Sequence, residues 1–193
     1  MKNNILIING HPNKESFNYA LANAYQQGAL KSKAQVDVIH IGELDFNPNL
    51  QYGYTKRIEL EPDLLVSLEK IKKADHLVWI HPVWWGALPA MMKGFIDRLF
   101  LPGIAYQYRE NSVWWDKLLT GKTARIITTL DQPAWYYRIF CGNPSVNQLK
   151  KSTLEFCGIK PVAVTAIAII KTSTEKQRAA WIAKVYQLGE NHK

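Results

Sequence analysis

The sequence is poor in cysteine, in long apolar runs and in acidic residues, and each shortage excludes a class of protein. Its two cysteines, Cys141 and Cys157, are too few for a disulfide framework or a cysteine-based zinc site. We expect both to be reduced thiols in or near the core. No apolar run is long enough to cross a bilayer, and the first one, residues 5–8, does not resemble an export signal. We therefore expect a cytoplasmic protein that is not embedded in a membrane.

The shortage of acidic residues leaves the chain basic. It has 24 Lys and Arg against 16 Asp and Glu, a formal charge of +8. Such a balance favours anionic ligands. However, the basic clusters and the aromatic clusters occupy different segments, whereas a nucleic-acid-binding surface interleaves them. We expect no nucleic-acid partner.

Several catalytic and metal-binding motifs are also missing. The five histidines are scattered and no HExxH pattern occurs, so we expect no metal site. The stretch "GKT" at 121–123 lacks the first glycine of a P-loop and precedes a strand instead of following one. No glycine-rich dinucleotide fingerprint follows the first strand, which makes a standard Rossmann site improbable on sequence grounds.

Alternation of buried strands and amphipathic helices is the main pattern that is present. Buried apolar runs and alternating segments predict strands at residues 5–9, 35–39, 76–80, 123–129 and 162–170. Helices are predicted at residues 16–33, 62–74, 89–100, 147–156 and 174–188. This order predicts an α/β fold: a single flavodoxin-like domain, 1–193, whose five-stranded parallel sheet has the order 2-1-3-4-5 and helices on both faces. Residues 42–61 and 101–121 are expected to be irregular elaborations.

Ligands of such folds bind at the carboxyl edge of the sheet, where the strand order reverses. The first loop there ends at Ser16, a good helix N-cap, so Ser16, Phe17 and Asn18 are candidates for holding a phosphate at the helix start. A plain serine cap without a ligand is an equal alternative for this segment.

Two further loops at the same edge are rich in aromatic side chains. Six of the seven tryptophans fall within residues 79–135, and the adjacent Trp84 and Trp85 cannot both face one core. Aromatic walls of this kind suit a flat ring system. Thr128 and Thr129 end the fourth strand, where their hydroxyls are candidates for bonding the polar edge of a heterocycle. The candidate aromatic contacts are Trp135, Tyr136, Tyr137, Tyr106 and Tyr108.

These segments together resemble the flavodoxin-like NAD(P)H:quinone oxidoreductase family, the DT-diaphorase type, including its shorter bacterial members. The residues that carry the likeness are "HPNKESFNYAL" at 11–21, "HPVWWGALPAMMKGFIDRLFLPGIAY" at 81–106, "TT" at 128–129 and "LEFCGI" at 154–159. The resemblance covers nearly the whole chain and implies a bound flavin, FAD with FMN as the alternative, together with NAD(P)H as electron donor. It also implies a homodimer and a quinone or similar flat acceptor.

The resemblance assigns roles to individual positions. The implied flavin-binding residues are His11, Ser16, Phe17, Asn18, Pro82, Val83, Trp84, Trp85, Thr128, Thr129, Leu130 and Asp131. The implied substrate-binding residues are Trp85, Tyr106, Tyr108 and Trp135. Tyr136, with Tyr137 as its alternative, matches a tyrosine that assists proton transfer, and Gln51 loosely matches a residue near the adenylate part of the flavin.

The chain also departs from the family pattern. Leu130 and Asp131 stand where the family has two glycines, and Gly142 stands near the place of a family histidine that pairs with the tyrosine. The expected reaction is two-electron hydride transfer by a ping-pong cycle, in which the backbone N–H groups of the loop at 84–85 and the Tyr136 hydroxyl stabilise negative charge. A regulatory subunit of a potassium-efflux system and a flavodoxin-like electron carrier stay open as alternatives.

Overall fold

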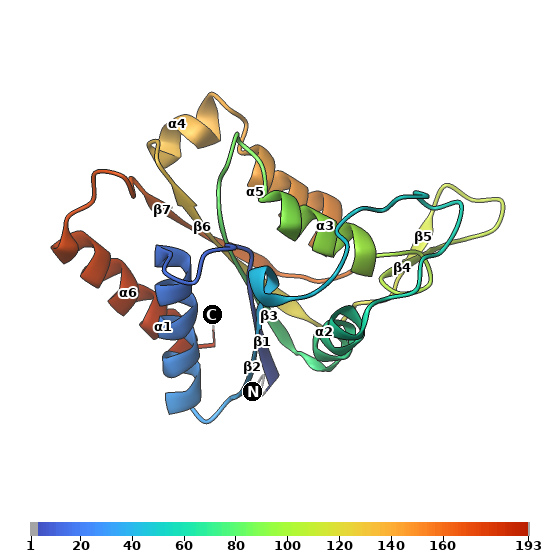
Figure 1. Cartoon of the computed structure of the whole chain (residues 1–193), viewed down its shortest axis with the longest axis horizontal. Helices are drawn as coiled ribbons and strands as arrows, with labels where there is room; N and C mark the ends of the chain where they lie inside the picture. Colours follow the sequence, from blue (N-terminus) through green and yellow to red (C-terminus); the bar gives the residue numbers. More distant parts are fainter. Residues whose placement is uncertain (1–3, 193) are drawn as a thin grey trace.

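A five-stranded parallel sheet forms the centre of the molecule. The computed structural model describes residues 4–192 and orders the strands β2-β1-β3-β6-β7 (Figure 1). The strands are β1 (Asn4–Asn9), β2 (Gln35–His40), β3 (His76–Pro82), β6 (Thr123–Leu130) and β7 (Val162–Ala168). Since β6 and β7 are the fourth and fifth strands of this sheet along the chain, the predicted order 2-1-3-4-5 is confirmed.

Helices cover both faces of the sheet. The helices are α1 (Phe17–Lys31), α2 (Pro62–Lys73), α3 (Ala90–Leu99), α5 (Pro144–Leu149), continued by the π-helical η2 (Lys150–Glu155), and α6 (Glu175–Glu190). Helices α1 and α6 lie on one face, while α2, α3 and α5 lie on the other (Figure 1). Because successive side chains of a strand point to opposite faces, each strand contributes to two apolar clusters: Leu77 and Trp79 face one, Val78 and Ile80 the other.

The structure adds elements that the apolar patterns did not predict. Residues 101–121 contain a second, antiparallel sheet of β4 (Tyr106–Tyr108) and β5 (Trp115–Lys117). The third loop at the carboxyl edge holds a short helix, α4 (Ala134–Ile139). The helix predicted from residue 147 begins at Pro144 instead, in the first turn, where proline is favoured. A single 3₁₀ turn, η1 (Ile41–Glu43), follows β2.

Helices α1 and α6 touch backbone to backbone through two glycines. A Cβ atom on Gly28 would lie 2.0 Å from the carbonyl oxygen of Tyr186, and one on Gly189 would lie 2.2 Å from that of Tyr25. No side chain fits at either position. This contact fixes the two helices against each other on one face of the sheet.

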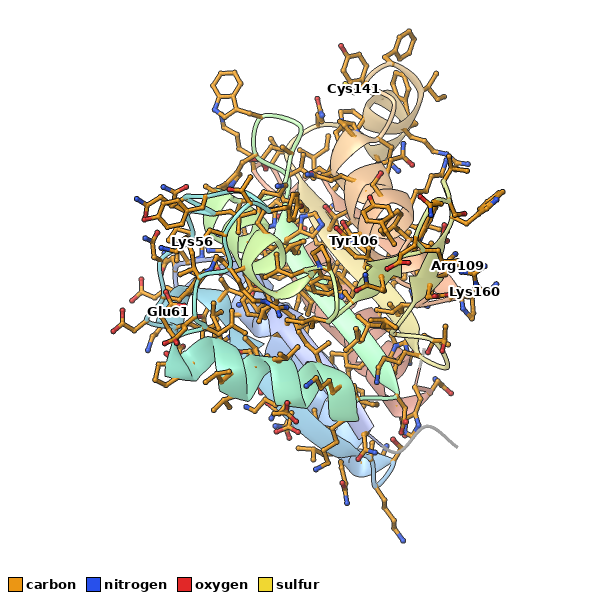
Figure 2. All side chains as sticks on the ribbon, turned by 90° about the vertical axis from the view of Figure 1, so that its right-hand side faces the viewer. Lys56, Glu61, Tyr106, Arg109, Cys141 and Lys160 are labelled. Carbon is orange, nitrogen blue, oxygen red and sulfur yellow. The ribbon has the colours of Figure 1, made fainter. Side chains whose placement is uncertain are left out.

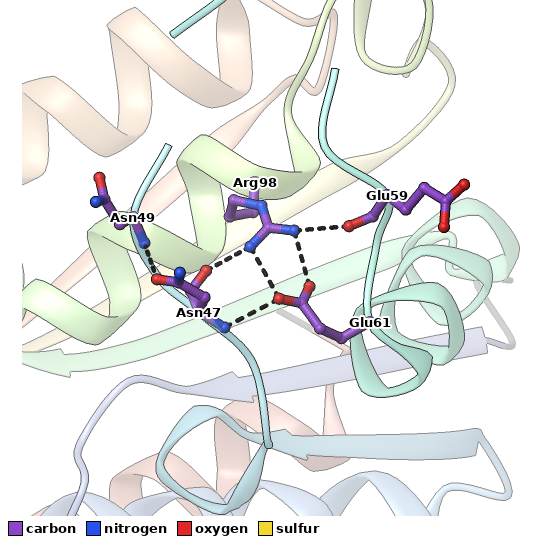
Figure 3. A network of polar contacts seen from close by, with 5 residues as sticks. All are labelled: Asn47, Asn49, Glu59, Glu61 and Arg98. Atoms are coloured by element: carbon purple, nitrogen blue, oxygen red, sulfur yellow. Dashed lines mark hydrogen bonds and ion pairs between the residues drawn. The ribbon is translucent and has the colours of Figure 1, made fainter. Parts of the chain in front are cut away.

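A buried arginine holds the long loop after β2 against α3. The Arg98 side chain is 1% exposed. Its guanidinium donates to the carbonyl oxygens of Asn47 and Glu59 and lies 2.8 Å and 3.1 Å from the two carboxylate oxygens of Glu61 (Figure 3). The Asn47 N–H also donates to the Glu61 carboxylate, which lies at the start of α2. The ion pair of Arg98 and Glu61 therefore ties residues 47–61 to α3 and to the start of α2.

The remaining sequence expectations concern thiols, metals and membranes. Cys157 is buried as expected, whereas Cys141 lies exposed in the connection between α4 and α5 (Figure 2). Within residues 4–192, no cluster of three or more His, Cys, Asp or Glu side chains is arranged to hold a metal ion. None of the helices described is long and apolar enough to span a bilayer.

Candidate functional site

A cleft of about 330 Å³ lies at the carboxyl edge of the sheet, where β1 and β3 diverge into their loops. Ten of the twelve residues assigned to flavin binding line it: His11, Ser16, Phe17, Asn18, Pro82, Val83, Trp84, Thr129, Leu130 and Asp131. They come from three loops far apart in the sequence. These side chains are far apart in the sequence, and they meet because β1, β3 and β6 are neighbours in the sheet.

The first loop is held at the end of β1 by hydrogen bonds between residues that are two positions apart. The buried Asn9 accepts a hydrogen bond from the His11 N–H at 3.1 Å, and the His11 Nδ1 accepts one from the Asn13 N–H at 3.0 Å. Since Nδ1 is an acceptor, Nε2 carries the proton of the neutral imidazole. Burial lowers the pKa of His11, which favours this neutral form at pH 7. His11, which lines the cleft, thus carries an N–H donor at Nε2.

The start of α1 contains two buried polar atoms without protein partners. Ser16 occupies the N-cap position, but its hydroxyl makes no capping hydrogen bond, and its Oγ is buried without a partner within residues 4–192. Asn18 accepts a hydrogen bond from the Thr129 hydroxyl at 3.0 Å, while its Nδ2 is buried and unpartnered in the same described chain. Buried polar groups are normally paired, so these two atoms point to a ligand.

The second loop is a tight two-residue turn. Trp84 and Ala87 exchange backbone hydrogen bonds of 3.1 Å and 2.9 Å, and both central residues have positive φ, +50° at Trp85 and +74° at Gly86. A type I′ turn needs this pair of angles. The Trp85 side chain stands fully in solvent, outside the cleft, whereas Trp84 contacts His11 edge-on with a ring separation of 5.4 Å.

The hydrogen bonds of this loop limit its predicted role in stabilising negative charge. The Val83 N–H donates to the Thr129 carbonyl at 2.9 Å and the Trp84 N–H to the Ala87 carbonyl at 3.1 Å. Both donors are therefore already used. The N–H groups of Trp85 and Gly86 have no acceptor in the part of the chain that the structure describes.

The end of β6 divides its two threonines between the faces of the sheet. Thr129 points toward α1 and bonds Asn18, so Thr128 points to the opposite face, where it lines a different cavity. Beyond them, Asp131 accepts a hydrogen bond from the Lys171 N–H at 2.8 Å. A neighbouring cavity, also of about 330 Å³, extends from this point past Trp85 and Gly86.

The tyrosines of α4 differ sharply in exposure. Tyr137 is 2% exposed, and its hydroxyl donates to the Gly86 carbonyl at 2.9 Å and accepts from the Ser145 N–H at 2.9 Å. It anchors α4 to the Trp85 turn. Tyr136 is 42% exposed and stacks on Phe140 at 5.3 Å, beside the exposed Trp135. Of the two candidates, only Tyr136 has a hydroxyl available to a ligand.

Tyr106 and Tyr108 lie away from the cleft within this chain. They stand on β4, with their rings edge-on at 5.3 Å, and Tyr106 lines a separate cavity of about 300 Å³ between α3 and η2. Figure 2 shows Tyr106 well apart from Cys141, which marks the α4 end of the molecule. Burial raises the pKa of Tyr106 to about 12, so its hydroxyl stays protonated. A single copy of the chain does not bring these tyrosines to the cleft.

The cleft also contains residues that the sequence reasoning missed. Asn13, Ile170 and Arg178 line it. The Arg178 guanidinium lies 5.7 Å from the centre of the Phe17 ring and donates to the Ser173 hydroxyl at 2.9 Å. It has no carboxylate partner among the ion pairs of residues 4–192. Since the last strand also ends at this edge, its following loop and helix were a fourth segment to consider.

Comparison with known proteins agrees with this fold. Residues 3–188 match a family described as having a flavodoxin-like fold. The chain is 30% identical over 185 residues to an uncharacterized NAD(P)H oxidoreductase of Haemophilus influenzae, covering 93% of this chain and 90% of the relative. Smu.1420 from Streptococcus mutans has a similar structure, with a TM-score of 0.85, 34% identity and coverage of 97% of this chain and 98% of its own.

A second solved structure extends the similarity of the fold. The NAD(P)H:quinone oxidoreductase from Methanothermobacter marburgensis superposes with a TM-score of 0.83 and covers 100% of both chains at 21% identity, a level that shows the fold alone. The family match and the relatives above 25% identity show more than the fold. They include the NAD(P)H dehydrogenase (quinone) 1 of Cavia porcellus, 28% identical over 180 residues, which cover 80% of this chain and 64% of the relative. The chain is therefore an enzyme of the flavodoxin-like family of NAD(P)H oxidoreductases and quinone dehydrogenases.

Proposed function

We propose that this enzyme binds a flavin in the cleft between α1, the Trp84 loop and the end of β6, and uses it to pass two electrons from NAD(P)H to a quinone or similar flat aromatic acceptor. The observation that carries the proposal is the convergence of ten predicted flavin-binding residues on one cleft. The name of the Cavia porcellus relative, NAD(P)H dehydrogenase (quinone) 1, supports the acceptor class.

The polar end of the cleft fits a phosphate. The N–H groups of the first turn of α1 point outward, and the helix dipole favours an anion there. The unpartnered Ser16 Oγ and Asn18 Nδ2 supply further donors, and the Arg178 guanidinium adds a positive charge opposite Phe17. These groups match the tail of a flavin nucleotide better than they match a plain serine cap, which would use the Ser16 hydroxyl.

The other end of the cleft fits a planar ring. Pro82, Val83 and Trp84 form an apolar wall, and Leu130 faces them from the end of β6. Leu130 is buried and bulkier than the glycine of the family pattern, so it narrows the floor of the cleft and helps to exclude water. A flavin held here would supply the hydride chemistry, while the protein supplies position and electrostatics. The donor and the acceptor then occupy the same place in turn.

Tyr136 is the residue that we assign to proton transfer. Its ring is half-exposed and stacks against Phe140, so its hydroxyl would hold the proton at the Oη atom. Tyr137 acts as a positioning residue, because its buried hydroxyl ties α4 to the Gly86 carbonyl. The N–H groups of Trp85 and Gly86 are the backbone donors still available for a developing negative charge.

We also propose that the working enzyme is a homodimer. The exposed Tyr108 and the cavity beside Tyr106 would then complete the acceptor site of the partner subunit, since neither reaches the cleft of its own chain. FAD is the proposed cofactor, with FMN as the alternative. Trp135, exposed beside Tyr136, would contact the acceptor, as would the fully exposed Trp85.

The first test is the visible spectrum of the purified protein, followed by anaerobic addition of NADPH. A flavin band that bleaches supports the proposal, and absence of any band after reconstitution with FAD and FMN refutes it. The double variant Ser16→Ala with Asn18→Ala removes both unpartnered donors, so we expect flavin to bind at least about tenfold more weakly. Asn23→Ala, an exposed position on the same helix, is the matched control. Equal affinities would disprove the phosphate assignment.

A further inference from the structure

A second large cavity lies outside the flavin cleft. It is a groove of about 880 Å³ between α4, α5 and η2 on one side and the outer face of β6 and β7 on the other. Its floor is apolar and includes the exposed side chains of Val164 and Ala166 on the edge strand β7. The flavin chemistry above gives no role to the charged residues that line it.

The charge along this groove is of one sign. Arg138, Lys150 and Lys151 line it, and no Asp or Glu does. Lys150 has a distant partner, the Glu155 carboxylate at 3.9 Å. The side chains of Arg138 and Lys151 make no ion pair or hydrogen bond within residues 4–192. The groove therefore combines an apolar floor with at least two uncompensated positive charges, and it suits an anion that also carries a flat ring.

The groove meets the flavin cleft at one residue. Leu130 lines the groove, the cleft and the third cavity beside Trp85, so the three spaces adjoin at the end of β6. Thr128 lines the groove from the face opposite Thr129, and its Oγ is buried without a partner in the described chain. A molecule whose reactive ring lies in the cleft would have to pass Leu130 to reach the groove.

We propose that this groove binds the phosphate-bearing adenosine half of the nicotinamide donor, with Arg138 and Lys151 as its charge contacts. The inference rests on the proposed function, because it names the site for the part of NAD(P)H that does not react. With a flavin in the cleft, the non-reacting half of the donor must lie outside it, and the adjoining groove of about 880 Å³ has room for that half.

The same charges give the enzyme a means of choosing its donor. NADPH differs from NADH by one phosphate on the adenosine ribose. An arginine fork and a neighbouring lysine favour the donor that brings the additional phosphate. We therefore expect a preference for NADPH that is set by residues on α4 and η2, away from the reacting ring. Such a preference weakens with rising salt, since both groups are solvent-exposed.

The test uses 2′,5′-ADP, which is the phosphate-bearing half of NADPH and has no nicotinamide. Isothermal titration calorimetry on the flavin-loaded protein measures its binding without any turnover. We expect binding by the wild type and a loss of about a hundredfold in Arg138→Gln with Lys151→Gln, at about tenfold for each charge contact. The matched control is Lys73→Gln with Lys184→Gln, which removes equal charge from exposed positions on α2 and α6.

Kinetics with two donors complete the test. In the Arg138 and Lys151 double variant, the KM for NADPH should rise at least tenfold, while the KM for dihydronicotinamide mononucleotide, which lacks the adenosine half, should stay unchanged. Failure of 2′,5′-ADP to bind the wild type overturns the inference, as does equal binding by the double variant and its control. If no donor bleaches the wild-type flavin, the proposed function fails separately, whatever the calorimetry shows.

Discussion

Burial of His81 makes the stability of this protein depend on pH in a calculable way. His81 is fully buried on β3, at the floor of the loop that carries Trp84 and Trp85. Its Nδ1 lies 3.0 Å from the Pro82 carbonyl oxygen, and its Nε2 has no partner within residues 4–192. Burial lowers the pKa of His81 from 6.5 to about 4. The folded protein therefore holds this imidazole neutral over a range in which an unfolded chain would protonate it.

The sign and size of the effect follow from this difference. Between pH 6.5 and about 4 the unfolded chain binds a proton at His81 that the folded protein does not bind, so acid favours unfolding. Each pH unit in this window removes about 1.4 kcal/mol, and the whole shift of about 2.5 units removes about 3 kcal/mol of the free energy of unfolding. The stability that comes from keeping His81 neutral is fully present above pH 6.5 and is lost below about pH 4.

The measurement is a series of urea unfolding curves of wild type and His81→Gln between pH 4.5 and 7.5, followed by tryptophan fluorescence. Burial also lowers the pKa of His11 and His40, but both residues are present in the two proteins, so their effects cancel in the difference. We expect the stability advantage of the wild type over the variant to shrink by about 2–3 kcal/mol as the pH falls. Parallel stability curves for the two proteins would refute the reasoning.

Three further predictions concern the packing that supports the site. Gly28→Ala should lower the free energy of unfolding by roughly 1–3 kcal/mol in urea titrations, because its Cβ meets the α6 backbone; an unchanged midpoint would contradict the contact. Glu61→Leu should lower the free energy of unfolding by roughly 3 kcal/mol more than Glu59→Leu does. Glu61 pairs with the buried Arg98 through its carboxylate, whereas Glu59 does so only through its backbone carbonyl, so equal losses of stability would disprove this. Trp85→Gly should not lower Tm, since it relieves a φ of +50° and removes a fully exposed side chain; a clear drop would show a buried role.

The parts of the fold that could be predicted from sequence are those that apolar patterns specify. The central strands are continuous buried runs, and helix starts at Pro62 and Thr174 follow known preferences; Thr174 forms the full capping box with Gln177. The hairpin of β4 and β5 was missed because each strand has only three residues and pairs outside the main sheet. Helix α4 was missed because its sequence, AWYYRI, is rich in aromatic residues that favour strands.

The candidate site was predictable where topology alone decides position. The sheet order is enough to bring Ser16, Trp84 and Thr129 to one edge. It does not tell which way each side chain points, so Trp85 and Thr128 were placed with their neighbours, although strand alternation already separates Thr128 from Thr129. Arg178 was missed because its contribution depends on how α6 packs against α1, which no local pattern reveals.

That packing has a mechanical consequence for ligand capture. Gly28 and Gly189 hold the backbones of α1 and α6 in direct contact. Phe17 and Arg178, at the other end of these two helices, should therefore move together as one rigid unit. The other side of the cleft is the loop that carries Trp84, and the short α4 is joined to its turn through one buried hydroxyl, that of Tyr137, at Gly86. Opening and closing around a ligand would therefore be one-sided: the phosphate end stays still, and the aromatic end of the cleft yields.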